Sequence, residues 1–326
     1  MCQDRQDTNA QALLHIRKLR GGSQPILVRA NDGFFYVVKF LDNLQGVNLL
    51  FNEALGTELY RRAGLPVPEW RPIFVSDDFL DQNPACWMET EHGRYRPQSG
   101  YCFGSRFLGL RDASLFEILP GRSFSRIKNR RDFWTARVLD VLCEHTDNRQ
   151  ALFLQRDSGP LEAYFVDHGH LFGGARGDEP PRMMASRYLD SRIYAAPTAE
   201  DAQRIQEAIQ RVELSELLNI AYGLPRGWCT EIALERFARF ARQVSDTSQL
   251  KRSIRVILGE DRLAGKIDDR CGKKCVIRTR RSGLHASIPV SEFGERICVG
   301  CSDFAGDQGQ HGPQSICPPY TYAANS

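Results

Sequence analysis

The chain has 326 residues, of which 42% are hydrophobic and 25% charged, values typical of a globular protein with a full apolar core. Its formal net charge of +3 is too small to give a strong nucleic-acid signal. No segment approaches the roughly 20 consecutive apolar residues of a membrane span, and the polar N-terminus does not look like a signal peptide. We therefore expect a cytoplasmic protein with no membrane partner.

A three-stranded β-meander is predicted over Ala10–Leu41. Its apolar runs are separated by G-G-S-Q-P and by Asn31-Asp32-Gly33, which is a good hairpin signal. The adjacent Gly21 and Gly22 let a backbone approach a ligand closely and offer N–H groups to an anion. Lys39 lies inside the third strand, either on a solvent-facing edge or as an ammonium directed at phosphate oxygens.

A helix is predicted over Val47–Ala63, with Gly64 after it. Its apolar stripe consists of Phe51, Leu55 and Leu59. Glu53 lies on the same helix. If this helix faces the sheet that carries Lys39, Glu53 can hold the lysine in place as an ion pair.

The next segments are a strand, a long irregular region and a helix. R-P-I-F-V predicts the strand, and Asp77–Gly104 has aromatic residues among polar residues and prolines. We expect that region to be a loop-rich join between two lobes. From about Leu110 the composition becomes helical, and Asp132 is the predicted N-cap of a helix that leads to His145.

The stretch from His145 to Gly174 contains one predicted β-hairpin. Its strands are Ala151–Gln155 and Leu161–Val166, joined by the turn R-D-S-G-P. An antiparallel hairpin brings its two ends together, so Asp147 and Asp167 should lie near each other. Two close carboxylates repel unless a cation or a shared proton relieves them. This predicts a divalent metal, with one carboxylate as its ligand and the other as a base.

The remainder of the folded region is predicted to be helical. Thr198–Tyr222 is amphipathic, Thr230 can cap a helix that follows it, and Leu250–Leu258 is a further short helix. A β-rich first half with one helix and a mostly helical second half is an α+β pattern. The sequence has no P-loop, dinucleotide-binding or zincin motif.

The order of these features is the order found in kinases: glycine turn, strand lysine, helix glutamate, catalytic aspartate, hairpin, metal aspartate. The local sequences resemble the HipA-like kinase family, a branch of the protein-kinase-like fold that includes the phosphatidylinositol kinases. The matching stretches are L-R-G-G-S-Q-P, D-G-F-F-Y-V-V-K-F, F-N-E-A-L-G-T-E-L, G-L-P-V-P, F-G-S-R-F, T-D-N-R-Q-A-L-F and V-D-H-G-H-L-F. They cover roughly Leu14 to Phe172 and imply a bilobal fold.

The resemblance implies a role for each matching residue. The phosphates of ATP would be covered by Gly21, Gly22, Ser23 and Gln24 and bound by Lys39, with Glu53 holding its ammonium. Asp147 would orient and deprotonate an acceptor hydroxyl. Asp167 would hold Mg²⁺, which takes few protein oxygens and keeps waters and phosphate as its other ligands. The acceptor would be a serine or threonine of a protein, or a small-molecule hydroxyl.

One position departs from the family pattern. The wider fold supplies a second metal ligand, an asparagine, about five residues after the catalytic aspartate, where this chain has Leu152. The nearby carboxamides are Asn148 and Gln150, and we favour Gln150 because it stands directly before the strand. If neither reaches the metal, the chain is a nucleotide-binding pseudokinase or an interaction module.

Three histidines near the two aspartates offer an alternative. His145, His168 and His170 could form a zinc or iron site with them. The spacing of His168 and His170 points both rings to one face of an extended chain. This interpretation leaves the glycine turn, Lys39 and Glu53 without a role, so structural histidines are the preferred interpretation.

The ten cysteines fall into two groups. Those scattered singly are expected to be packed thiols: Cys2, Cys86, Cys102, Cys143 and Cys229. The other five lie in a basic, glycine-rich tail, where Cys271-x₃-Cys275 and Cys298-x₂-Cys301 approach a four-thiolate zinc spacing. The tail is either disordered or a small Zn²⁺ module. The expected domains are therefore 10–104 (N-lobe), 105–259 (helical C-lobe) and 260–326 (tail).

Overall fold

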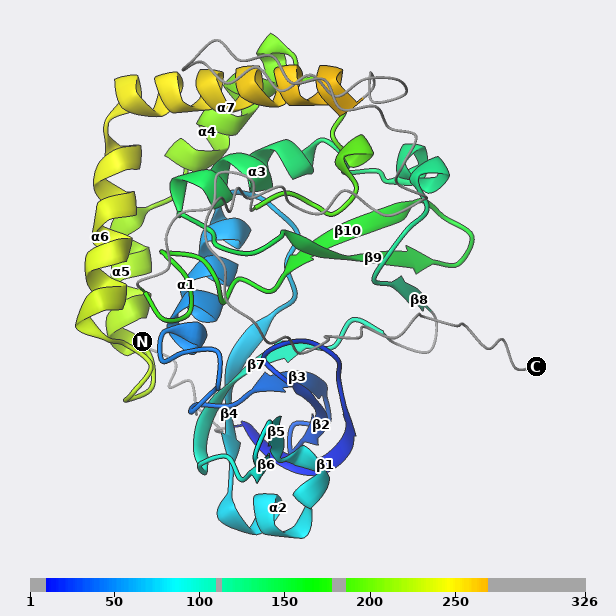
Figure 1. Ribbon diagram of the computed structural model, residues 1–326, viewed down its shortest axis with the longest axis vertical. Helices are drawn as coiled ribbons and strands as arrows, with labels where there is room; N and C mark the ends of the chain where they lie inside the picture. Colours follow the sequence, from blue (N-terminus) through cyan, green and yellow to red (C-terminus); the bar gives the residue numbers. More distant parts are fainter. Residues whose placement is uncertain (1–9, 110–112, 178–185, 269–326) are drawn as a thin grey trace, which may run out of the picture. The chain divides into compact units, whose positions relative to one another are not determined.

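A computed structural model describes residues 10–109, 113–177 and 186–268, all of which belong to one compact unit (Figure 1). The first part of this unit is a closed β-barrel whose strands neighbour one another in the order β1-β2-β3-β7-β4. The barrel strands are β1 (Ala10–Lys18), β2 (Ile26–Ala30), β3 (Phe35–Lys39), β4 (Trp70–Val75) and β7 (Gly100–Arg106). The barrel encloses its own apolar core, which includes Ile26, Val38 and Ile73.

The predicted meander is confirmed as β1, β2 and β3, which pair antiparallel in sequence order. The prediction of a loop-rich join over Asp77–Gly104 is wrong, because β7 lies largely within it and closes the barrel by pairing with β3 and β4. The glycines of β7 suggested a loop, but Gly104 is required by packing. A Cβ at Gly104 would lie 2.2 Å from Cγ1 of Ile73. The other elements of this region are α2 (Asp77–Gln82), the 3₁₀ turn η1 (Pro84–Cys86), β5 (Met88–Thr90) and β6 (Gly93–Tyr95).

Helix α1 (Leu49–Arg62) confirms the helix predicted over Val47–Ala63. Its apolar residues join the larger of the two hydrophobic cores. Its polar residues Asn52, Glu53 and Thr57 are buried as well. Helix α1 is therefore enclosed on most of its circumference, and its polar side chains contact protein rather than water.

A three-stranded sheet follows, in the order β10-β9-β8. Its members are β8 (Ala113–Phe116), β9 (Gln150–Arg156) and β10 (Leu161–Val166). The predicted hairpin is confirmed as β9 and β10, with Gln150 opposite Val166 and Gln155 opposite Leu161. β8, which pairs with β9, was not predicted.

The remaining elements are mainly helices. They are η2 (Gly121–Arg126), α3 (Asp132–Leu142), η3 (Ser191–Ile193), α4 (Ala199–Gln210), α5 (Leu214–Gly223), α6 (Glu231–Ser245) and α7 (Thr247–Asp268). Helix α4 packs against α3, α6 and α7. The second half is therefore mostly helical, as predicted, and the described residues contain both helices and strands.

Of the two predicted helix caps, Thr230 is confirmed and Asp132 is not. Thr230 caps α6, where its side chain accepts a hydrogen bond from the N–H of Ala233. Asp132, the predicted N-cap of α3, is instead its first residue and contacts Arg204 at 2.9 Å. A carboxylate in the first turn still favours the helix through its dipole.

Two further segments are longer or more divided than predicted. The stretch Thr198–Tyr222 forms two helices, α4 and α5, instead of one. Helix α7 continues past Leu258 to Asp268 and therefore crosses the expected start of the tail at residue 260. The cysteine pairs of the tail lie outside the described residues.

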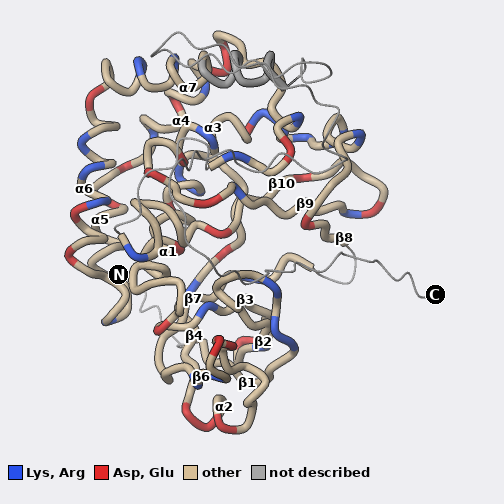
Figure 2. The backbone as a smooth tube through the Cα atoms, in the orientation of Figure 1, with Lys and Arg blue, Asp and Glu red and all other residues tan. Residues whose placement is uncertain are grey.

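Cys86, Cys102 and Cys143 are free and buried, as predicted, and Cys229 is free and partly buried. Lysines, arginines and carboxylates are interspersed over the described chain (Figure 2). Along α6, for example, Glu235 is followed by Arg236 and Arg239. None of the helices within the described residues combines the length and the apolar character needed to cross a bilayer.

Candidate active site

Three charged side chains from distant parts of the chain meet between β3, α1 and the end of β10. Lys39 Nζ contacts Oε1 of Glu53 and lies 2.6 Å from Oδ1 of Asp167. Lys39 and Asp167 are 128 residues apart in sequence. Lys39 is 7% exposed and the side chain of Asp167 24% exposed, so the cluster is largely shielded from water but open on the Asp167 side.

The charges of this cluster stabilise one another. Burial by itself lowers the pKa of the Lys39 ammonium, but the carboxylates of Asp167 and Glu53 outweigh burial and raise that pKa above its ordinary value. Burial by itself would raise the pKa of Asp167. The charge and the hydrogen bond of Lys39 outweigh burial and hold that pKa well below its ordinary value. For Glu53, burial raises the pKa against the opposing effect of Lys39. Asp167 is therefore a carboxylate at neutral pH and is available to a cation.

Glu53 also binds the backbone that follows Asp167. It accepts hydrogen bonds from the N–H of His168 at 3.2 Å and of Gly169 at 2.9 Å. Gly169 is required at this contact, because a Cβ there would lie 2.3 Å from Cδ1 of Leu49 and 2.9 Å from Oε1 of Glu53. One carboxylate thus fixes both the ammonium of Lys39 and the loop that carries Asp167.

Gln150 and Asp147 lie at the start of β9. The Gln150 carboxamide donates a hydrogen bond from Nε2 to Oδ2 of Asp167, the oxygen that Lys39 does not contact. Asp147 is half-buried, and its Oδ1 accepts the N–H of Asn148 at 2.7 Å. The N–H of Thr146 donates to the carbonyl of His170 at 3.0 Å, so the segment with Asp147 runs beside the segment with Asp167. Asn148 is exposed.

The glycine turn is held by two neighbouring segments. The Gln24 side chain makes two hydrogen bonds to the backbone of Glu89, one donated at 2.8 Å and one accepted at 2.7 Å. The carbonyl of Ser23 accepts a hydrogen bond from Nδ2 of Asn43 at 2.8 Å.

Among the described residues no hydrogen bond joins the glycine turn, residues 21–24, to Lys39, Glu53 or Asp167. Hydrogen bonds and ion pairs in the structure therefore bring Lys39, Glu53, Asp167 and Gln150 together, and the turn is not joined to them by such a bond within the described residues.

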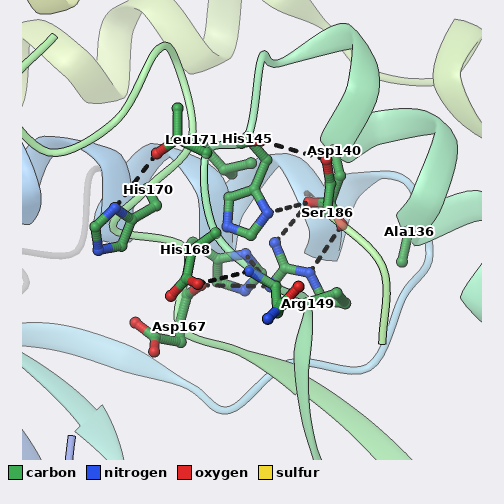
Figure 3. Close-up of polar contacts among 12 residues, drawn as sticks. Ala136, Asp140, His145, Arg149, Asp167, His168, His170, Leu171 and Ser186 are labelled. Atoms are coloured by element: carbon green, nitrogen blue, oxygen red, sulfur yellow. Dashed lines mark hydrogen bonds and ion pairs between the residues drawn. The ribbon is translucent and has the colours of Figure 1, made fainter. Parts of the chain in front are cut away.

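A buried ion pair supports the segment between Asp147 and Gln150 (Figure 3). Arg149 Nε and Nη2 donate to the two carboxylate oxygens of Asp140 in α3, at 2.9 and 2.6 Å. Its Nη1 donates to the carbonyl of Val166 at 2.8 Å. The hydroxyl of Tyr60 in α1 donates to Asp140 Oδ1 at 2.6 Å. The side chains of Arg149 and Asp140 are fully shielded from solvent.

The sequence did not indicate these supporting residues. Arg149 and Asp140 are nine residues apart and look like surface charges in the sequence. Asn52, directly before Glu53, is fully buried and contacts the loop after Asp167. The available signal was the spacing of three residues that are not large and apolar, Asn48, Asn52 and Gly56, which are four apart and indicate a second contact face on α1.

Two histidines near the site, His145 and His168, are buried. Burial, followed by the charge of Arg149, lowers the pKa of both His145 and His168 well below the ordinary value. Neither ring nitrogen of His145 has a hydrogen-bond partner among the described residues. Within those residues, no group of three or more His, Cys, Asp or Glu side chains is placed to hold a metal ion. The transition-metal alternative therefore gains no support from this region.

Because His145 and His168 are buried, we expect the free energy of unfolding to fall in acid. The unfolded chain binds protons at His145 and His168 with pKa values near 6.5 whereas the folded chain does not, so lowering the pH favours unfolding. At pH 5.5 each histidine costs about 1.4 kcal/mol, and together they lower the free energy of unfolding by about 3 kcal/mol relative to a protein without them. Urea titrations at pH 7.5 and 5.5 measure this fall. Replacing one of them, as in His168→Leu, should remove about half of it, and exposed His92→Gln should leave it unchanged. An equal fall in the free energy of unfolding for the wild type, His168→Leu and His92→Gln would contradict the conclusion that buried His168 stays uncharged in the folded protein.

Comparison with solved structures identifies the fold. The structure is similar to that of a proinflammatory kinase, CtkA, from Helicobacter pylori, with a TM-score of 0.50 and 14% sequence identity over 78% of this chain and 97% of that chain. The chain has a protein-kinase-like fold. Two structures of the Golgi casein kinase are more distant. One has a TM-score of 0.44 and 12% identity over 76% of this chain and 74% of that one. The other, with Mn/ADP bound, has a TM-score of 0.37 and 12% identity over 78% and 74%.

No protein-family model matches the sequence. No curated protein matches it either.

Proposed function

We propose that this protein is an ATP- and Mg²⁺-dependent phosphotransferase, a HipA-like serine/threonine kinase of the cytoplasm. The observation that carries the proposal is the convergence of Lys39, Glu53 and Asp167, in which a strand ammonium, a helix carboxylate and the carboxylate after the hairpin lie in direct contact. A phosphotransferase needs a fixed ammonium and a metal carboxylate within reach of one triphosphate. The protein-kinase-like fold supports the same assignment.

Lys39 would bind the phosphates of ATP, with its charge and direction fixed by Glu53. The turn of Gly21, Gly22, Ser23 and Gln24 would cover them from the barrel. On binding, phosphate oxygens would replace the Asp167 carboxylate beside the Lys39 ammonium. This exchange keeps the ammonium paired with anionic oxygens and frees Asp167 Oδ1.

The residues at Asp167 can supply oxygen ligands for Mg²⁺. The Asp167 carboxylate is one such ligand, and the Gln150 carboxamide, which donates from Nε2 to that carboxylate, would offer its Oε1 to the metal after rotating. Mg²⁺ prefers one or two protein oxygens together with phosphate and water. When bound, Mg²⁺ supplies neutralisation of the charge on the transferring phosphoryl group. Gln150 would occupy the role that an asparagine has in related kinases.

Asp147 would orient and deprotonate the acceptor hydroxyl. Its segment is held beside that of Asp167 by the hydrogen bond between Thr146 and His170. The Asp147 side chain is half-buried and accepts only a local backbone N–H among the described residues, so it keeps acceptor capacity for a hydroxyl. The acceptor is proposed to be a serine or threonine of a protein.

A second candidate function is that of an inert nucleotide-binding protein. The observation that favours it is Leu152, which stands where the second metal ligand is expected and is paired with Tyr164 within the β9–β10 ladder. If the Gln150 carboxamide does not turn its oxygen to the metal, Mg²⁺ has one protein ligand fewer. ATP would then be bound without being used.

The test is phosphoryl transfer from ATP labelled at its γ-phosphate. The wild-type protein with Mg²⁺ should label itself or an added mixture of dephosphorylated proteins. Asp147→Asn removes the base and should reduce the rate by at least about 100-fold, in line with the 10²–10⁴-fold contribution of general bases. The same variant should retain the rise in melting temperature that MgATP produces in the wild type, because Asp147 does not bind phosphate.

The possible results separate the two candidates. Label transfer that depends on Asp147 supports the kinase. A rise in melting temperature with MgATP but no transfer by the wild type supports the inert binder. If MgATP changes neither label nor melting temperature, both candidate functions are wrong.

A further inference from the structure

The side chain of Asn52 on α1 spans the loop that follows Asp167. Its Nδ2 lies 2.9 Å from the carbonyl oxygen of Gly169, 2.7 Å from that of Leu171 and 3.2 Å from that of Gly174. A carboxamide nitrogen carries two hydrogens, so three acceptors share them. The three carbonyl oxygens determine the orientation of the amide, because the flipped amide would oppose oxygen to oxygen. Asn52 is fully buried.

This arrangement is costly for stability. Oδ1 of Asn52 is buried without a hydrogen-bond partner among the described residues. An unpaired buried acceptor lowers stability, because it loses its hydrogen bonds to water on folding and gains none in return. An apolar residue of the same size would avoid that cost, so the stability of α1 does not explain why an asparagine stands here. The three carbonyl contacts offer an explanation, since no apolar side chain can make them.

A residue just before the loop held by Asn52 has a strained backbone. Asp167 has a φ of +61°, a left-handed conformation that is unfavourable for a residue other than glycine. Such a residue persists only where its surroundings over-determine it. Before Asp167, Arg149 holds the carbonyl of Val166. After Asp167, Glu53 accepts hydrogen bonds from the N–H groups of His168 and Gly169. Asn52 donates to the carbonyls of Gly169, Leu171 and Gly174.

We propose that Asn52 is a positioning residue that fixes the loop after Asp167 and thereby aims the Asp167 carboxylate at the metal. The effect on the loop follows from the contacts alone, and the effect on metal use rests on the proposed function. Asn52 does not contact Asp167 and acts on it through residues 169–174 and the backbone. Its loss should therefore loosen the loop and weaken metal binding without preventing the folding of the protein.

The experiment compares Asn52→Leu with Thr57→Val. Thr57 is a matched control: it lies on the same helix and is also buried, and its hydroxyl donates within the described residues to the carbonyl of Glu53 in α1. Hydrogen exchange of the nucleotide-free proteins is measured by mass spectrometry over residues 168–177. In Asn52→Leu this segment should exchange at least ten-fold faster than in the wild type, and in Thr57→Val it should not change.

The second measurement uses label transfer at saturating ATP over a range of Mg²⁺ concentrations. In Asn52→Leu the Mg²⁺ concentration for half-maximal rate should rise at least ten-fold, and kcat at saturating Mg²⁺ should stay within three-fold of the wild type. A merely structural residue would lower kcat by lowering the folded fraction and would not move the Mg²⁺ dependence. If Asn52→Leu does not fold, Asn52→Ser, which also cannot reach all three carbonyls, carries the same expectation.

The outcomes separate this inference from the proposed function. Faster exchange with a shifted Mg²⁺ dependence supports both. Unchanged exchange over residues 168–177 overturns the inference, whether or not the wild type transfers phosphate. An active protein with faster exchange but an unshifted Mg²⁺ dependence also overturns it. Faster exchange in a protein that neither binds MgATP nor transfers phosphate supports the effect on the loop and refutes the proposed function.

Discussion

Lys39→Met should unfold far more easily than the wild type and should lose phosphoryl transfer. The methionine has a similar length but no charge, so Glu53 and Asp167 would face each other without a cation between them. Removing one partner of a buried ion pair costs about 3–5 kcal/mol, because the remaining charge stays buried and uncompensated. We expect a fall of this size in the free energy of unfolding at pH 7.5, measured by urea titration. Transfer should fall at least as far as in Asp147→Asn, because the nucleotide loses its ammonium.

Three comparisons test whether the lost charge causes the fall in stability. Lys128→Met removes a lysine from an exposed pair with Glu162 and should cost less than about 1 kcal/mol. In Lys39→Met the Glu53 pKa rises further, so the deficit relative to the wild type should be smaller at pH 5 than at pH 7.5, since a raised pKa favours the protonated, folded form at low pH. Adding Glu53→Gln should restore much of the stability but not the transfer. A Lys39→Met protein as stable as Lys128→Met would show that the three charges do not meet in solution.

The elements that the sequence predicted well are those set by local pattern. The β9–β10 hairpin follows from two apolar runs around R-D-S-G-P, and the meander from its turn residues. β7 was missed because G-Y-C-F-G-S-R has weak strand propensity of its own. It becomes a strand because β3 and β4, far away in sequence, pair with it on both sides. The division between α4 and α5 was missed because the amphipathic pattern continues through both helices.

The charged centre of the site was predictable, and its supports were not. The order of Lys39, Glu53 and Asp167 matched a known family pattern, and their contact in the structure agrees with that expectation. The functional roles of these three residues, of Gln150, of Asp147 and of the glycine turn all remain predictions. Asn52 could not be predicted, because a buried asparagine and an exposed one look alike in a sequence. Only the fold of the loop after Asp167 gives its carboxamide three carbonyl oxygens to bind.

Arg149→Met should be the other strongly destabilising substitution, for the same electrostatic reason at a deeper position. The variant leaves the Asp140 carboxylate buried with the Tyr60 hydroxyl as its remaining close donor. We expect a loss of about 3–5 kcal/mol in the free energy of unfolding, measured by urea titration. Arg149→Lys should not rescue it, because an ammonium cannot donate to both carboxylate oxygens in the fork geometry of a guanidinium. Arg204→Met, which breaks a partly exposed pair with Asp132, is the matched control and should cost less than about 1 kcal/mol.

The double variant Arg149→Met, Asp140→Leu shows what the pair contributes beyond stability. Replacing both partners of a buried ion pair by apolar residues is often neutral or stabilising, so most of the loss should be recovered. Phosphoryl transfer should not be recovered, because Nη1 of Arg149 also holds the carbonyl of Val166, directly before Asp167. Recovery of both stability and transfer would mean that the pair only fills space. If the double variant recovers stability but not phosphoryl transfer, the ion pair connects the segment bearing Asp147 to the strand that precedes Asp167. Apolar side chains in its place would then be unable to make this connection.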